Sequence, residues 1–332
     1  MTSMERFKRA NLLSSFCPTA ILLLFGCILM GPRALPAQSE RPGATSPPAL
    51  IAKTELVVLP VSITDSNGNF VSGLSSQNFR VYENGRLQKI TAFQDGDTPV
   101  TVGLIVDHSR SMGPKLTEVA DAVSVLARSS NPQDEMFVVD FNDDVSVELL
   151  DGKPFTDDAN ELAKAVSAVR ARGRTALYDA VAEGLLHLQL GRWDKRALII
   201  VSDGGDNASQ LKYSRLLALA QHSQVVIFSV GLADGEGEEN PEVLRRLSKA
   251  TGGISFFPKS LPDVTDISRR VARDLREQYT LGFVPETAVP SDSFRQLTVK
   301  VSAPGRGKLR VRTRPGYFKH AQVPGDSAKG AS

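Results

Sequence analysis

TVGLIVDHSRSMG, at residues 101–113, joins an apolar run to a cluster of oxygen side chains. The apolar half is bounded by turn formers, a pattern typical of a parallel strand buried on both faces. It ends at Asp107, and hydroxyls follow at Ser109 and Ser111 before a helical pattern begins near Lys115. In open α/β sheets such a strand-to-helix loop lies at the carboxyl edge, where ligands bind. Because its side chains offer oxygen ligands, the loop suits a hard divalent cation.

Two later stretches carry residues of the same kind. A Gly-x-Thr sequence ending at Thr175 opens a helical run, and an apolar run at residues 197–201 leads through one serine into Asp203 and two glycines. In this order and at this spacing, the three stretches resemble the von Willebrand factor type A domain and its metal-ion-dependent adhesion site. The resemblance implies a site for Mg²⁺, with Mn²⁺ or Ca²⁺ as alternatives. Five residues would form it: Asp107, Ser109, Ser111, Thr175 and Asp203.

The resemblance also implies a role for each residue. Ser109 and Ser111 would bind the ion through their hydroxyls, and Thr175 would bind it directly or through water. Asp107 and Asp203 would hold bound waters and supply negative charge. An open coordination position would then accept an acidic residue from a protein partner. The competing interpretation is that these side chains merely cap helices, which explains each of them singly but not three loops meeting at one edge.

Three titratable residues near the motif need separate interpretation. Asp206 and Asp179 are candidates for a supporting contact behind the ligands, although a solvated surface position is the simpler interpretation of both. His108 could be a ligand or a general base. Because its two neighbours would point at the ion, we expect His108 to point away and to be a bystander.

Charged residues accompany the predicted site. An acidic loop at residues 234–239 follows an expected strand at 225–230 and would lie at the same edge. A solvated loop is the default interpretation, but like charge at the rim would also disfavour acidic partners. Arg170, Arg172 and Arg174, in the neighbouring loop, would offset that charge.

The pattern of apolar residues predicts the fold class. Alternating strands and helices at residues 98–278 predict an α/β domain, a doubly wound and mostly parallel sheet covered on both faces. Residues 54–97 and 279–318 alternate instead as short β-strands, among them one strand at 87–93. Neither segment has enough strands alone, so we expect the two to form a small β-sandwich-like module. Residues 319–332 are expected to be a disordered tail.

The first 37 residues have the pattern of an export signal. A basic flank precedes an apolar core at residues 20–30, which is too short for a comfortable membrane span. A Pro-, Ser- and Gly-rich linker at 38–53 follows. We therefore expect a periplasmic or extracellular protein with no membrane span after cleavage. A lipoprotein anchored through Cys27 is the second interpretation, and an uncleaved anchor is the third.

Composition excludes several classes of function. The chain has 39 basic and 37 acidic residues, of which the first 37 residues hold four and one. The near-neutral remainder does not favour nucleic-acid binding. Both cysteines, Cys17 and Cys27, lie in the signal, so no disulfide or thiol nucleophile would remain after cleavage.

The sequence favours an exported, metal-dependent protein-binding module for adhesion or assembly over two other classes. One alternative is a structural component of the cell envelope, in which the metal only stabilises the fold. A hydrolase is less favoured, because the chain has no G-x-S-x-G or H-E-x-x-H sequence and no evident base for Ser109 or Ser111.

Overall fold

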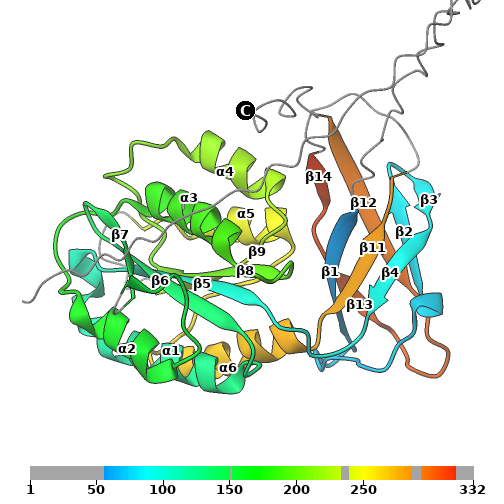
Figure 1. Cartoon of the computed structure of the whole chain (residues 1–332), viewed down its shortest axis with the longest axis horizontal. Helices are drawn as coiled ribbons and strands as arrows, with labels where there is room; N and C mark the ends of the chain where they lie inside the picture. The colour runs from blue at the N-terminus through cyan, green and yellow to red at the C-terminus, as the bar shows by residue number, and fades with distance from the viewer. Residues whose placement is uncertain (1–55, 150–151, 233–238, 286–292, 319–332) are drawn as a thin grey trace, which may run out of the picture. The chain divides into compact units, whose positions relative to one another are not determined.

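A computed structural model of the chain describes residues 56–149, 152–232, 239–285 and 293–318 (Figure 1). The predicted signal, the linker and the tail lie outside these residues, as does nearly all of the acidic loop. No helix in the described ranges is both long enough and apolar enough to cross a membrane.

The α/β domain is built on a six-stranded sheet with the strand order β10-β9-β8-β5-β6-β7. Neighbouring strands are parallel except at one edge, where β7 pairs antiparallel with β6. The strands are β5 (Thr101–Asp107), β6 (Glu135–Phe141), β7 (Val145–Glu148), β8 (Arg196–Ser202), β9 (Val226–Gly231) and β10 (Ser255–Phe256). The predicted doubly wound, mostly parallel sheet is confirmed.

Helices cover both faces of this sheet (Figure 1). The apolar residues of β5 alternate between the two helical layers: Leu104 packs in one core and Ile105 in the other, as the two-residue period of a strand requires. One layer contains α1 (Leu116–Ser129), α2 (Ala159–Ala168) and α6 (Asp263–Arg276). The other contains α3 (Leu177–His187), α4 (Tyr213–His222) and α5 (Pro241–Thr251).

Two four-stranded antiparallel sheets form a β-sandwich, which we call the β module. Each sheet combines strands from before and after the α/β domain, in the orders β13-β1-β11-β4 and β14-β12-β2-β3. The early strands are β1 (Val57–Thr64), β2 (Phe79–Glu83), β3 (Arg86–Gln88) and β4 (Ile90–Gln94). The late strands are β11 (Tyr279–Phe283), β12 (Phe294–Val301), β13 (Arg310–Arg312) and β14 (Gly316–Phe318). An apolar core between the sheets, with Leu59, Val81 and Phe283 at its centre, explains why neither set of strands suffices alone.

The single strand predicted at residues 87–93 is wrong. The chain instead changes sheets at Lys89, so β3 pairs with β2 in one sheet and β4 pairs with β11 in the other. Gln88 is buried immediately before this crossing. A continuous alternating pattern therefore conceals a chain that passes from one layer of the sandwich to the other. The short strand β14 was also not predicted.

Polar contacts join the β module to the α/β domain. Arg312 of β13 is hydrogen-bonded to the carboxylate of Asp274 on α6 and to the carbonyl of Gly252 at the end of α5. Ser62 of β1 donates to the same carboxylate over 2.7 Å. Arg314 donates to the carbonyl of Ser223 over 2.6 Å. Helix α6 also leads along the chain into β11, so the two parts are joined by the chain and by these contacts.

Candidate metal centre

The first loop of the site begins where β5 ends. Asp107 is fully buried there, and its carboxylate accepts hydrogen bonds from the Ser109 backbone N–H over 2.8 Å and from the Ser202 hydroxyl over 2.6 Å. After Ser109 the chain forms a 3₁₀ turn (Arg110–Lys115). Met112, which is fully buried, anchors this turn in the apolar core. The loop is thus held at its start by hydrogen bonds and at its middle by packing.

Hydrogen bonds connect four of the five predicted ligands. The hydroxyl oxygens of Ser109 and Ser111 lie 3.2 Å apart, and the Ser111 hydroxyl donates to Asp203 Oδ2 over 3.0 Å. Asp107 is connected to this hydrogen-bond network because its carboxylate accepts from the Ser109 backbone N–H. Because β5 and β8 are parallel neighbours, the residues that follow them meet at the same edge of the sheet.

Ser202 is a positioning residue that the sequence did not reveal. Its hydroxyl donates to Asp107 and accepts from the backbone N–H of Gly204 over 3.0 Å, so it ties the ends of β5 and β8 together. Gly204 has a φ of 85°, and a Cβ there would lie 2.5 Å from the carbonyl oxygen of Asn240. The turn after Asp203 therefore requires glycine. The sequence feature that could have identified this role is the position of Ser202 directly before Asp203.

Thr175 lies in the second loop, which runs beside the first. The backbone N–H of Arg172 donates to the carbonyl of His108 over 2.9 Å, and that of Arg110 donates to Gly173 over 3.4 Å. The Thr175 backbone N–H is held by the side chain of Asn207. The Thr175 hydroxyl makes no hydrogen bond to the part of the chain that the structure describes. The structure therefore brings the Thr175 loop to the site without a direct contact from its side chain to the other four residues.

Asp206 and Asp179 are not solvated surface residues, which corrects the simpler interpretation of their sequence positions. Asp206 accepts from the Tyr178 backbone N–H over 3.1 Å and from the Ser209 hydroxyl, and partial burial raises its pKa. Asp179 accepts from two successive backbone N–H groups, those of Gln210 and Leu211. Both carboxylates fasten the loop after β8 to the start of α3.

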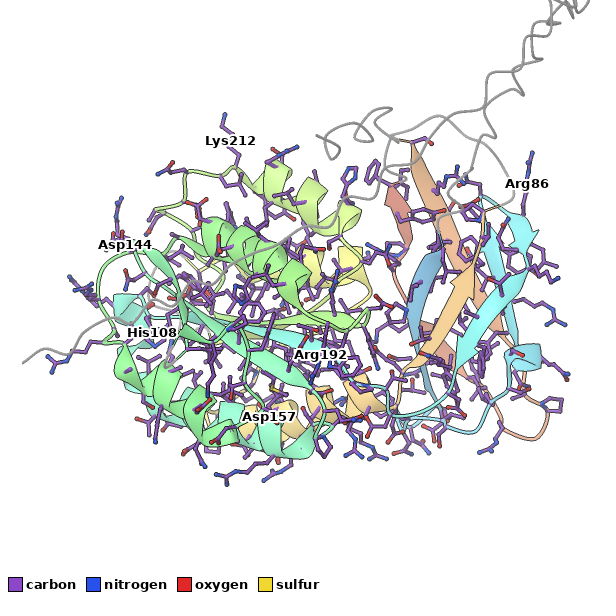
Figure 2. The ribbon with its side chains drawn as sticks, viewed as in Figure 1. Arg86, His108, Asp144, Asp157, Arg192 and Lys212 are labelled. Carbon is purple, nitrogen blue, oxygen red and sulfur yellow. The ribbon has the colours of Figure 1, made fainter. Side chains whose placement is uncertain are left out.

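His108, which is labelled in Figure 2, is fully buried, and its ring nitrogens are directed at Val166 and Asp140, as expected for a bystander. Its Nε2 lies 2.8 Å from the carbonyl oxygen of Val166, and because a carbonyl only accepts, Nε2 carries the hydrogen. Its Nδ1 lies 3.0 Å from the carboxylate of Asp140 on β6. His108 thus supports the loop from behind by pairing with Asp140.

The electrostatics of the site favour a cation. Burial raises the pKa of Asp107 to about 6, against the opposing effect of hydrogen bonds from Ser109 and Ser202, and the charge of Asp203 raises it further. Within the described ranges, neither Asp107 nor Asp203 forms an ion pair with Lys, Arg or His. Two buried carboxylates and two hydroxyls within hydrogen-bonding distance form an all-oxygen donor set. This donor set fits a hard divalent cation and not a soft one.

Fold and site together define a class: an α/β domain whose parallel sheet carries an oxygen-lined site at its carboxyl edge. The sequence profile of the von Willebrand factor type A domain matches residues 102–270, about half of the chain. The chain therefore belongs to the von Willebrand factor type A domain family. Domains of this family mediate protein–protein interaction.

Individual relatives are distant. An uncharacterized protein of Synechocystis sp., sll0103, is 26% identical over 170 residues, which are 49% of this chain and 39% of the relative. The chain thus spans about two fifths of that relative's length.

Similar solved structures are also remote in sequence. A von Willebrand factor type A protein from Catenulispora acidiphila is 13% identical, covering 82% of this chain and 76% of its own, with a TM-score of 0.48. The vWF domain of the type V pili tip protein Mfa5 from Porphyromonas gingivalis is 12% identical, covering 58% and 99%, with a TM-score of 0.44. These likenesses concern the fold alone.

Proposed function

We propose that this chain is a metal-dependent protein-binding module of adhesion or assembly. Its cation would be Mg²⁺, with Mn²⁺ or Ca²⁺ as alternatives. Asp107, Ser109, Ser111, Thr175 and Asp203 would hold it. The observation that carries the proposal is the pair of buried carboxylates, Asp107 and Asp203, which receive neutral donors but no cation from the described part of the chain.

Each residue has a definite task in this proposal. Ser202 and the Ser109 backbone N–H fix the carboxylate of Asp107, and the Gly205 backbone N–H fixes that of Asp203 over 2.9 Å. The hydroxyls of Ser109 and Ser111 are neutral donors, so they would leave much of a cation's charge uncompensated. A bound divalent cation would supply a Lewis-acidic contact for an acidic residue of a protein partner.

Binding is favoured over the two alternative functions. A hydrolase that used Ser109 or Ser111 as its nucleophile would need a base beside it, but His108, the histidine of this loop, is turned toward Val166 and Asp140. A purely structural component would need the ion only for stability. The proposed site instead lies at the sheet edge where α/β proteins bind ligands, and Ser111 is only partly buried.

Titration calorimetry on the full chain tests this function. Mg²⁺ should bind at one site, and a short Gly/Ser peptide with one Asp should bind only when Mg²⁺ is present. Ser109→Ala should weaken both events, whereas Ser167→Ala, at an exposed serine of α2, should change neither. Mg²⁺ binding without any peptide binding would favour the structural alternative. Equal Mg²⁺ binding by wild type and Ser109→Ala would contradict the assigned site.

Export belongs to the same proposal and rests on residues 1–37 of the sequence. Intact-mass measurement of the exported protein should give a chain that begins near Gln38. A mass that retains the sequence from Cys27 with an added lipid would establish the lipoprotein alternative instead.

A further inference from the structure

Four exposed arginines lie in the loops that carry Ser109, Ser111 and Thr175, and we call Arg110, Arg170, Arg172 and Arg174 the arginine rim. We propose that this rim selects partners in which several acidic residues are clustered, one for the cation and the others for the arginines. The inference rests on the proposed function, and it deepens that function by naming the class of partner that the site would take.

Every arginine of the rim is exposed and comes from the first or the second of the three loops that form the site. Arg110 lies between Ser109 and Ser111, so the chain alternates between a site residue and an outward cation. Arg174 directly precedes Thr175 in the same way. Arg172 is placed beside the first loop by the hydrogen bond from its backbone N–H to the carbonyl of His108.

Most of the rim arginines have no ion-pair partner in the part of the chain that the structure describes. Arg174 forms an ion pair over 2.9 Å with Asp143, on the turn between β6 and β7. The side chains of Arg110, Arg170 and Arg172 form no hydrogen bond or ion pair with any residue that the structure describes. Asp143 pairs with Arg174, and Asp107 and Asp203 belong to the proposed cation site. Three guanidinium groups therefore have no carboxylate partner among the described residues.

The backbone of the turn at Gly173 and Arg174 is fixed by its conformation and by contacts with Asp143. Gly173 has a φ of 71°, and a Cβ at this residue would lie 1.8 Å from the Asp143 carboxylate. Asp143 also accepts from the Arg174 backbone N–H over 3.2 Å. The loop therefore presents Arg174 and its neighbours in a fixed backbone conformation.

Arginine suits the recognition of carboxylates. The planar guanidinium offers paired N–H donors that match both oxygens of a carboxylate, and it keeps its charge at any physiological pH. A single acidic residue bound to the cation would leave the rim unused. A run of acidic residues would contact both the cation and the rim, and its charge would also steer the partner toward the site.

Two fluorescent peptides test the proposal on the full chain. One is a short Gly/Ser peptide with a single Asp, and the other is a matched peptide with a run of Asp. In Mg²⁺ at low ionic strength, the Asp-run peptide should bind about tenfold more tightly, because several exposed charge pairs each add a modest gain. The advantage should shrink as salt is added.

Two matched double variants test whether the rim arginines cause the higher affinity of the Asp-run peptide. Arg110→Ala/Arg172→Ala should reduce the advantage of the Asp-run peptide to about twofold and leave the single-Asp peptide almost unchanged. Arg86→Ala/Lys89→Ala removes the same charge from exposed positions of the β module and should leave the advantage of the Asp-run peptide intact. Figure 2 labels Arg86. Equal affinities of the two peptides for wild type, or an equal loss in both variants, would overturn the proposal.

The outcomes separate this inference from the proposed function. If the single-Asp peptide needs Mg²⁺ and Ser109 but the Asp-run peptide has no advantage, the rim proposal fails and the metal-dependent function stands. If neither peptide responds to Mg²⁺ or to Ser109→Ala, the proposed function fails. Salt-sensitive, rim-dependent binding of the Asp-run peptide in EDTA would still support the rim. Dextran sulfate that binds the rim more tightly than the Asp-run peptide would point to a polysaccharide and overturn it.

Discussion

Two groups of buried carboxylates in this molecule have different surroundings. In the β module and at its contact with α6, each is paired with an arginine: Glu83 with Arg295, and Asp274 with Arg312. At the carboxyl edge of the central sheet, Asp107 and Asp203 receive only hydroxyl and backbone N–H donors from the described residues. In these two pairs the chain supplies its own cation. The edge that lacks one is where an exchangeable cation can bind.

The largest expected change in the free energy of unfolding comes from replacing Arg295, the cation that pairs with Glu83. Arg295 is fully buried, and its Nη1 lies 2.9 Å from Glu83, which also accepts from the Tyr317 hydroxyl. Arg295→Leu should lower the free energy of unfolding by about 3–5 kcal/mol, because it leaves a buried carboxylate without its partner. Urea denaturation measures this loss.

The double variant Glu83→Leu/Arg295→Leu is the control for that prediction. It removes both charges and should recover much of the stability, since the cost lies in the unpaired carboxylate and not in the lost pair itself. A double variant as unstable as Arg295→Leu alone would show that packing, and not charge pairing, dominates at this position.

A smaller effect is expected at Asp140, which lies close behind the site but has a partner. His108→Ala would leave a buried carboxylate and a cavity, and it should cost roughly 2–3 kcal/mol. Because His108 does not face the oxygen cluster, Mg²⁺ should still raise the melting temperature of this variant. Calorimetric melts with and without Mg²⁺ measure both effects. Complete loss of the Mg²⁺ response in a folded variant would place His108 in the metal site.

The sequence predicted the central sheet, and it marked the residues of the candidate site, because both depend on local patterns. Apolar runs marked β5 and β8, and the residues directly after them marked Asp107 and Asp203. Contacts between residues distant in the chain could not be predicted, because no local pattern indicates them. The pairing of Asp274 with Arg312 spans 38 residues, and His108 meets Val166 across 58.

The wrong predictions, for the strand at residues 87–93 and for Asp179 and Asp206, also arise because local patterns do not reveal long-range contacts. Alternation at residues 87–93 indicates an exposed and a buried face, but it does not tell which of two sheets each half joins. The acidic side chains of Asp179 and Asp206 suggest solvent. Their actual partners are backbone N–H groups of a loop whose path is set by the tertiary fold.

Because Asp107 has no built-in cationic partner among the described residues, we expect both stability and Mg²⁺ affinity to depend on pH. Burial raises the pKa of Asp107 to about 6 from 3.8, so the folded protein without metal binds this proton more tightly than the unfolded chain does. The contribution of Asp107 to stability therefore falls as the pH rises from about 4 to 6. Because a cation needs the ionised carboxylate, Mg²⁺ affinity should weaken about tenfold between pH 7 and pH 5. Calorimetric titration at both pH values checks this, and equal affinities would contradict it.

The most direct test of the central claim is the melting temperature as a function of Mg²⁺ for wild type and Asp203→Asn. The asparagine keeps the shape of the side chain and removes its charge. At a Mg²⁺ concentration ten times its dissociation constant, wild type should gain about 1.4 kcal/mol, a rise of roughly 3 °C for a protein of this size. Asp203→Asn should fold and show almost no rise. An equal rise in both proteins would mean that the ion binds elsewhere and that the carboxylates at the sheet edge are not its site.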